Sequence, residues 1–442
     1  MTAQAPARRA LGANYWKLLA AHAFSNLGDG LRIVAIPWLA SAITRDPLLI
    51  ATATLTVRLP WLLFALPAGV ITDRVDRRKL IAWTDVAAGL VMAGFALVVL
   101  ANQAAMADPE ALAAGTAEPP GHQALLLALL YTTALLIGLG EVLRDNAAQT
   151  LMPSIVPKER LERANGRMWG AELVMNQLVG PPLAGLLLAT ALALPFVVNV
   201  GTFALAAGLA FALIGSFAPH AQAPSGRIAW RAEIAEGVRW LWRHQLLRTL
   251  ALLLGVMNGM SMMATAIFVL FAQEILVLDA AGFGLVLTGT AVGGLAGSLL
   301  ADRVSSRIGP GTALLTSITG LGLALAMIGL VPVAMLAWSM LVVIGFLVVQ
   351  WNVVTVSLRQ TIVPDHLLGR VNSVYRFFGW GMISIGSLLG GVVVTTGELL
   401  VAREWALRAP FLLAATVYVI LLIYAAPRIN TRRIREARAA AE

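Results

Sequence analysis

One short stretch occurs twice in this chain at a constant spacing. Residues 155–166 read IVPKERLERANG and residues 362–373 read IVPDHLLGRVNS, so the Ile-Val-Pro start, a leucine, an arginine and an asparagine recur in step. Each copy lies between the fourth and the fifth of six long apolar segments. The repeat predicts two related halves that follow each other in the same orientation.

The composition indicates which solvent surrounds those halves. The chain has 442 residues, of which 59% are hydrophobic and 12% charged, and its mean hydropathy is +0.81. Soluble proteins carry about 25% charged residues. The polar surface is therefore too small for a water-facing body, and we expect a membrane protein. Because lipid satisfies no backbone hydrogen bonds, the apolar segments are expected to be helices.

Twelve segments reach the length of about 20 residues that is needed to cross a hydrocarbon layer about 30 Å thick. They are 16–43, 48–71, 80–101, 123–151, 167–191 and 195–217, then 246–276, 283–301, 312–331, 334–358, 371–396 and 405–426. The sequence thus predicts an all-α polytopic protein with a six-helix bundle at 1–217, a cytoplasmic linker at 218–245, a second six-helix bundle at 246–427 and a basic tail at 428–442.

The basic residues predict the orientation. Most of the 32 Lys and Arg residues lie in the two tails and in the loops that follow even-numbered spans, whereas loop 102–122 has none. Loops rich in Lys and Arg stay in the cytoplasm, so we expect both termini there and a location in the cytoplasmic (inner) membrane. We expect the positive residues behind the net charge of +9 to interact with membrane lipid, and we expect no nucleic-acid binding.

The sequence lacks the residues that metal, thiol, nucleotide-binding and enzymatic sites require. The chain has no cysteine, and its five histidines are scattered, so we expect neither a metal site nor a thiol site. No G-x-x-x-x-G-K-S/T motif is present, and Gly289, Gly293 and Gly297 are spaced for helix packing instead. Since no nucleophile is paired with a base at helical spacing, we expect no enzyme and no cofactor.

The linker contains an amphipathic segment. Within 227–244 the apolar residues Trp230, Ile234, Val238 and Leu241 fall on one helical face. A helix lying in the inner membrane interface and a solvated connector both fit this pattern. The tryptophans favour the interface.

The turn after the second span carries a candidate gate. Residues 69–79 read GVITDRVDRRK; the glycine would let helices approach, the aspartate would accept from a helix N-terminus, and the arginines would pair across the two bundles. An ordinary basic cytoplasmic loop is the alternative. The gating candidates are Gly69, Asp73, Arg74, Arg77 and Arg78 and, from an Asp-Arg echo in the second half, Asp302 and Arg303.

The fifth span contains a second motif, NQLVGPPLAG at 176–185. Pro181 is expected to bend the helix, while Gly180 and Gly185 allow close packing that seals one face of a cavity.

These two motifs resemble those of the major facilitator superfamily. Stretch 69–79 is similar to its signature between the second and third helices, and stretch 176–185 is similar to the antiporter signature. The similarity extends over nearly the whole chain and is greatest to proton-coupled drug and siderophore exporters such as the macrolide-efflux and enterobactin-export proteins. The resemblance implies two six-helix bundles with a substrate site between them, working as a monomer.

Charged residues inside the spans are the candidates for proton coupling. A charge at the bilayer centre costs about 3 kcal/mol or more, so such a residue indicates function by default. Spans one and four each carry a polar stripe at helical spacing. Ion pairs that only fix helix packing are the alternative. The proton-coupling candidates are Asp29, Arg32, Glu141, Arg144 and Asp145.

Further polar residues in the spans are candidates for the substrate cavity. A wall that is polar in the first half and largely apolar in the second suits amphipathic compounds. These candidates are His22, Asn26, Arg58, Asn258, Met262, Gln350, Asn352 and Arg376.

Together these features predict a secondary active transporter, a proton-coupled antiporter that exports small amphipathic compounds such as drugs or siderophore-like metabolites by alternating access. A lipid or lysophospholipid translocator and a proton-coupled importer are the alternatives within the same class. A sensor or scaffold that does not transport is the alternative outside it.

Overall fold

The computed structural model describes residues 11–72, 74–113, 115–215, 217 and 230–439, and every regular element within them is helical. The first half contains α1 (Ala13–Ile43), α2 (Pro47–Thr72), α3 (Arg77–Asn102), η1 (Gln103–Ala105), α4 (Pro109–Ala113), α5 (Gln123–Ile155), η2 (Lys158–Arg160), α6 (Leu161–Glu172), the π-helix η3 (Leu173–Val179), α7 (Gly180–Thr190) and α8 (Leu194–Phe211).

The second half begins after α9 (Trp230–Arg243). It contains α10 (Gln245–Ala266), α11 (Phe268–Glu274), α12 (Ala280–Ile308), α13 (Pro310–Leu330), α14 (Ala334–Ile362), α15 (Asp365–Gly397), α16 (Arg403–Ala425) and α17 (Thr431–Ala439).

Eleven stretches of the described chain are long and apolar enough to cross a membrane. Helix α1 is not among these because its polar stripe lowers its hydropathy, yet at 31 residues it is long enough, and it packs inside the first bundle against α7 and α8. Counting α1 restores the predicted twelve. The predicted fifth span is divided by η3, and the seventh is divided at Ile267 between α10 and α11.

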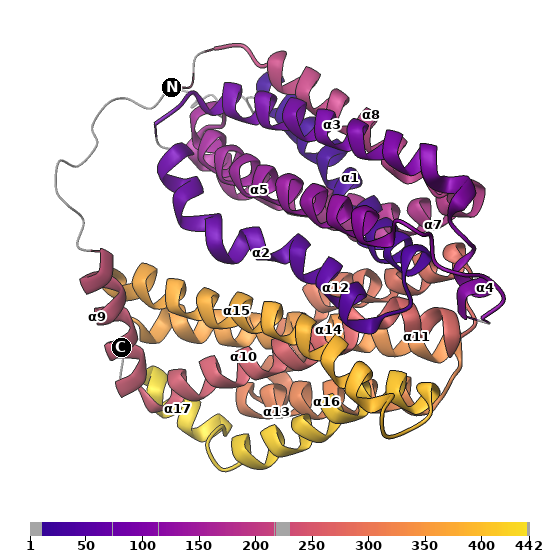
Figure 1. The fold of residues 1–442 in the computed structure, drawn as a ribbon. Coiled ribbons are helices and arrows are strands. Elements are labelled where there is room, and N and C mark those ends of the chain that lie inside the picture. The colour runs from indigo at the N-terminus through magenta and orange to yellow at the C-terminus, as the bar shows by residue number, and fades with distance from the viewer. Residues whose placement is uncertain (1–10, 73, 114, 216, 218–229, 440–442) are drawn as a thin grey trace.

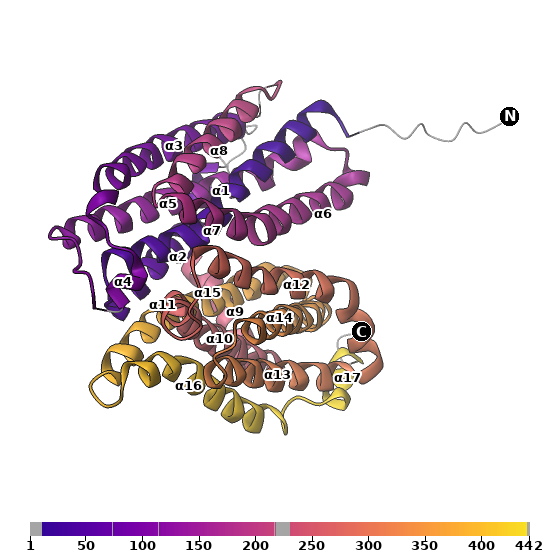
Figure 2. The ribbon, with the colours of Figure 1, turned by 90° about the vertical axis from the view of Figure 1, so that its right-hand side faces the viewer.

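The helices gather into two bundles, α1–α8 and α10–α17 (Figures 1 and 2). Helices α9 and α17 lie at one end of the molecule, and α4 and α11 lie at the other (Figure 1). By the predicted topology the end with α9 and α17 is cytoplasmic, so we call the opposite end the outer end.

The bundles meet chiefly through two helix pairs, α2 with α15 and α7 with α12. Small residues permit both contacts: a Cβ at Gly185 or Gly284 would overlap backbone of the opposite bundle, and one at Gly391 would lie 2.7 Å from the Cα of Leu48. Leu48 begins α2 and Gly391 lies near the end of α15, which places this contact at the outer end.

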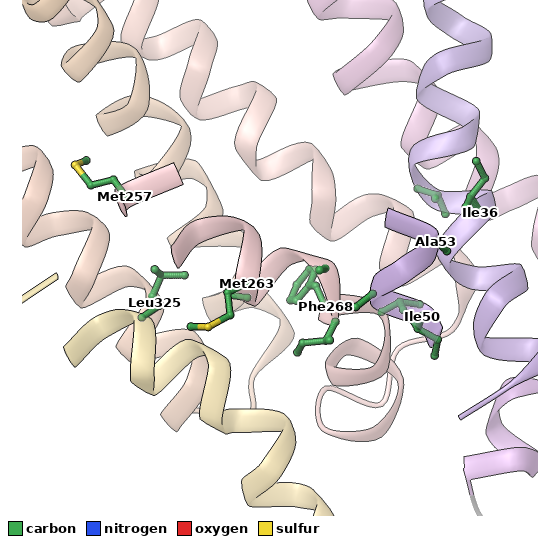
Figure 3. Close-up of a cluster of buried hydrophobic side chains, with 14 of the residues drawn as sticks. Ile36, Ile50, Ala53, Met257, Met263, Phe268 and Leu325 are labelled. Carbon is green, nitrogen blue, oxygen red and sulfur yellow. The ribbon is translucent and has the colours of Figure 1, made fainter. Parts of the chain in front are cut away.

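Apolar packing at the outer end is shared by the two bundles. One buried cluster contains Ile36, Ile50 and Ala53 from the first half together with Phe268 and Met263 from the second (Figure 3). A second cluster, which includes Tyr15, Ile81 and Leu151, belongs to the first bundle alone. The two bundles therefore share apolar packing at the outer end.

The glycines of α12 pack as expected. A Cβ at Gly289 would lie 2.6 Å from the carbonyl oxygen of Trp338, and one at Gly293 would overlap that of Val342. Both partners lie on α14, so the seam brings these two helices together within the second bundle.

Helix α9 lies beside α10 and α15 of the second bundle. Its apolar residues Val238 and Leu241 pack against the second bundle, where Leu241 is fully buried, and Glu236 pairs with Arg370 of α15. The side chains of Trp230 and Ile234 lie outside what the structure describes. The second bundle therefore takes up the described part of the apolar face, Val238 and Leu241.

Candidate functional site

The structure brings the five proton-coupling candidates together. Arg32 on α1 pairs with Asp29 one turn earlier and with Glu141 of α5, where Nη2 lies 3.2 Å from Oε2. Arg144 on α5 lies 3.2 Å from Oδ2 of Asp29 and 3.0 Å from Oδ1 of Asp145. The spacing along α1 and α5 places these groups on facing stripes, and the side chains link the two helices in a chain of ion pairs.

A sixth member, Asp85 on α3, escaped the sequence reasoning. Its side chain is 2% exposed, and its Oδ1 lies 4.0 Å from Nη1 of Arg144. The available signal was a lone carboxylate within the apolar span 80–101, which is the kind of residue that indicates function in a membrane.

The cluster contains more acids than bases. Four carboxylates, those of Asp29, Asp85, Glu141 and Asp145, surround Arg144 and its neighbour Arg32. Removing a net negative charge from water is costly, so the excess of carboxylates requires compensation within the protein. Among the described side chains, Nε and Nη1 of Arg32 are buried without a hydrogen-bond partner, which leaves donors for a different pairing.

Glu141 has a second partner that sequence reasoning missed. The indole Nε1 of Trp61 on α2 donates to Oε1 of Glu141 at 3.2 Å. The same ring stacks on Trp380 of α15, with centroids 5.6 Å apart and planes 16° from parallel.

The fifth span approaches the cluster through its π-helix. A Cβ at Gly30 would lie 2.5 Å from the carbonyl oxygen of Asn176, and one at Gly180 would lie 2.6 Å from the Cα of Gly30. Pro181 supplies no N–H to the helix, and the backbone shifts to the wider π pattern just before it. The expected close packing of Gly180 is present, next to Asp29.

A pocket of about 160 Å³ lies between the bundles at this level. Both halves contribute to it: Asp29, Arg32, Arg58 and Glu141 form its polar side, whereas Phe268, Val269 and Phe283 come from the second half. Of the predicted cavity residues, Arg58 and Met262 line this pocket.

Other predicted cavity residues lie elsewhere. His22 lies 3.2 Å from Asn26 and 3.9 Å from Glu172, next to the cluster on the same stripe of α1. Asn258 donates to the carbonyl oxygen of Gly379 and so joins α10 to α15.

Two polar residues of α14 and one of α15 also fall outside the pocket lining. Gln350 is buried and donates to Ala313 of α13, so it holds the second bundle together. Asn352 is exposed and donates to its own helix, and Arg376 is exposed on α15. Helical spacing alone did not reveal that α14 turns its polar residues away from the pocket.

The gating motif at 69–79 is described except for one residue. Asp73 lies outside the described residues. A Cβ at Gly69 would meet nothing within 4 Å, so this glycine does not serve a close helix contact here. Arg78 donates to the carbonyl oxygen of Leu213 within the first bundle. Among the described residues, Arg74, Arg77 and Arg78 form no contact across the bundles. Asp302 and Arg303 of the second half form none either.

Asp76, within the same motif, caps α3. Its carboxylate accepts from the backbone N–H groups of Arg78, Lys79 and Phe217. Burial alone would raise the pKa of Asp76, but these donors outweigh it and hold the pKa below its ordinary value.

At the outer end a polar network joins the bundles instead. Arg45, between α1 and α2, pairs with Glu274 of α11, and its Nη1 donates to Gln273 at 2.6 Å. Gln273 donates to Ser41, and Arg403 of α16 donates to Glu274 at 2.7 Å. We call Arg45, Glu274, Gln273, Arg403 and Ser41 the outer latch. The sequence offered one signal for this network: Arg45 and Arg403 are among the few arginines in the loops that are expected at the outer end.

Comparison with known proteins agrees with this architecture. The family model of the Major Facilitator Superfamily matches residues 18–387. The multidrug efflux pump Tap of Mycolicibacterium fortuitum is 28% identical over 404 residues, which cover 89% of this chain and 92% of that protein. The enterobactin exporter EntS of Citrobacter koseri is 26% identical over 327 residues, which cover 73% of this chain and 72% of that protein.

The fold has solved counterparts. A crystal structure of the nucleoside transporter NupG superposes with a TM-score of 0.70 at 13% identity, over 94% of this chain and 100% of that one. The chain belongs to the major facilitator superfamily and is a multi-pass membrane transporter.

Proposed function

We propose that this protein is a proton-coupled antiporter that exports small amphipathic compounds across the cytoplasmic membrane by alternating access. The observation that carries the proposal is the acid-rich cluster of Asp29, Asp85, Glu141 and Asp145, buried in the first bundle and open to the pocket through Asp29 and Glu141. Such a site requires protons and a small molecule as partners. All residues of the site lie in a single chain.

Arg32 is the residue that links protonation of the cluster to the arrangement of the helices. It is shared by Asp29 and Glu141, and its remaining buried donors are free within the described chain. A proton that neutralises one carboxylate releases Arg32 to the other. Asp29 lies on α1 and Glu141 lies on α5. When Arg32 moves from one carboxylate to the other, the electrostatic attraction between these two helices therefore changes.

The pocket suggests the class of substrate. Its polar wall offers carboxylates and guanidinium groups, while its opposite wall offers Phe268, Phe283 and Val269. A compound with one polar or cationic side and one apolar side matches both walls. The relatives Tap and EntS, named as a multidrug pump and an enterobactin exporter, support export of such compounds.

The outer latch and the shared apolar core indicate a state closed at the outer end. In the predicted topology this state faces the cytoplasm, from which an exporter loads. Alternating access then requires the latch to open once a substrate is bound.

The test uses everted membrane vesicles that contain the D29N or the E141Q variant. We expect both variants to reach the membrane and to lose substrate uptake driven by an acidic lumen. D279N is the matched control, because Asp279 is exposed and its carboxylate accepts from the backbone N–H of Gly282 on its own helix, α12.

Full proton-driven uptake by both D29N and E141Q would contradict the proposal. Movement of lipid without a pH gradient would favour a lipid or lysophospholipid translocator, and accumulation in right-side-out cells would favour an importer.

A further inference from the structure

Trp61 touches both the charged cluster and the opposite bundle. Its indole N–H donates to Oε1 of Glu141 at 3.2 Å, and its ring lies flat against Trp380 of α15. The other oxygen of Glu141 accepts from Arg32 at 3.2 Å. One side chain therefore connects the candidate proton-binding carboxylate to the contact between the bundles.

The tryptophan pair lies at mid-helix, on the cytoplasmic side of the close contact between Leu48 and Gly391. At the outer end α2 and α15 pack closely through Leu48 and Gly391, and at mid-helix they meet at the stacked rings. Further toward the cytoplasmic end, Val70 of α2 is 53% exposed and Phe377 of α15 is 65% exposed. Movement of the bundles about this pair would change the exposure of both cytoplasmic segments.

We propose that Trp61 is a positioning residue that couples the protonation of Glu141 to the separation of α2 and α15; this inference rests on the proposed function. When Glu141 is ionised, its charge-assisted hydrogen bond holds the indole in the orientation that stacks on Trp380. When Glu141 takes up a proton, that bond weakens and the ring is released. The contact between the bundles then loosens at the cytoplasmic side.

Several charged groups also act on Glu141 and remain in place when Trp61 is changed. Replacement of Trp61 by phenylalanine keeps an aromatic ring but removes the N–H donor together with part of the indole, and the W338F control makes the same change in size. The groups that stay are Arg32 and Asp29 on α1, Arg58 on α2, Asp85 on α3, and Arg144 and Asp145 on α5.

The experiment measures the distance between the cytoplasmic segments as a function of pH. Because the chain has no cysteine, V70C and S373C provide two unique sites for spin labels in the full protein in lipid nanodiscs. W61F is expected to move the midpoint of the distance change upward by about one pH unit, since the ionised carboxylate loses a donor.

W338F is the matched control. The indole of Trp338 donates to Oγ1 of Thr288 at 3.1 Å, within the second bundle and to an uncharged partner. We expect its midpoint to equal that of the parent chain.

Three further variants keep the inference falsifiable. E141Q is expected to lose this titration, and W61F added to E141Q should have no further effect if Trp61 acts through Glu141. W380A retains the hydrogen bond but removes the stack, and is expected to lose most of the pH-dependent distance change; it also carries the test if W61F fails to fold.

The outcomes separate this inference from the proposed function. A W61F midpoint equal to that of the parent, with E141Q still abolishing the titration, overturns the role of Trp61 alone. Proton-driven transport that survives in both D29N and E141Q overturns the proposed function.

Discussion

Replacement of Glu274 by glutamine is expected to open the outer end. In the outer latch the carboxylate of Glu274 binds Arg45 across the bundles while it also accepts from Nε and Nη2 of Arg403, at 2.7 and 3.0 Å. The side chains of Glu274 and Arg45 are only 12% and 13% exposed, so water screens the pair weakly. Glutamine preserves the size of the side chain but removes its charge.

The magnitude follows from that geometry. A hydrogen bond to a charged group contributes about 1.5–3 kcal/mol, and the pair across the bundles exists only while the outer end is closed. We take about 2 kcal/mol for its loss, which shifts the equilibrium toward the open state about thirtyfold. The hydrogen bonds from Arg45 to Gln273 and from Gln273 to Ser41 remain and limit the effect.

Distances between spin labels at the outer end provide the assay. A105C and L399C place labels on exposed positions of the two halves, and E274Q is expected to populate a longer distance. E404Q is the matched control, since Glu404 is 59% exposed and pairs with Arg408 on its own helix, where an ion pair contributes less than about 1 kcal/mol. A distance distribution for E274Q that overlays that of the parent chain would refute the reasoning.

Three other predictions concern stability and are checked by thermal unfolding in detergent. G293A is expected to destabilise the protein by about 1–3 kcal/mol because the new methyl group would overlap the carbonyl of Val342, whereas G294A, with open space around its Cβ, should change little; equal melting temperatures would contradict this. D76A removes the cap of α3 and should cost about 1 kcal/mol; an unchanged melting temperature would show that the cap is not needed. Because the folded pKa of Asp76 is lowered, its contribution should be fully present above the ordinary aspartate pKa of about 3.9 and be lost as the pH falls through the folded value, a loss that D76A should not show.

The apolar segments predicted the fold because lipid leaves few alternatives. A run of about 20 apolar residues must form a helix, and the repeated stretches 155–166 and 362–373 divide the helices into equal halves. Helical spacing also placed Asp29 with Arg32, whereas Arg144 and Asp145 are adjacent in the chain. These relations are local, so they follow from the order of residues along the chain.

Contacts between helices could not be predicted in this way. Glu141 meets Arg32, which lies 109 positions earlier, and Trp61 stacks on Trp380 of the other bundle. A period of 3.6 residues says which side chains share a face but does not say which helix that face meets or at what height. Gln350 shows the consequence, because its face meets α13 rather than the pocket.

The sequence alone therefore determined the helices, the two halves and the positions of the charged residues within the spans. Only the tertiary structure decided that these charges form one acid-rich cluster, that its shared Arg32 retains free donors among the described residues, and that the outer latch joins the bundles. The reason is physical: lipid forces each segment into a helix independently of its neighbours, whereas the pairing of buried charges depends on the rotation and height of every helix at once.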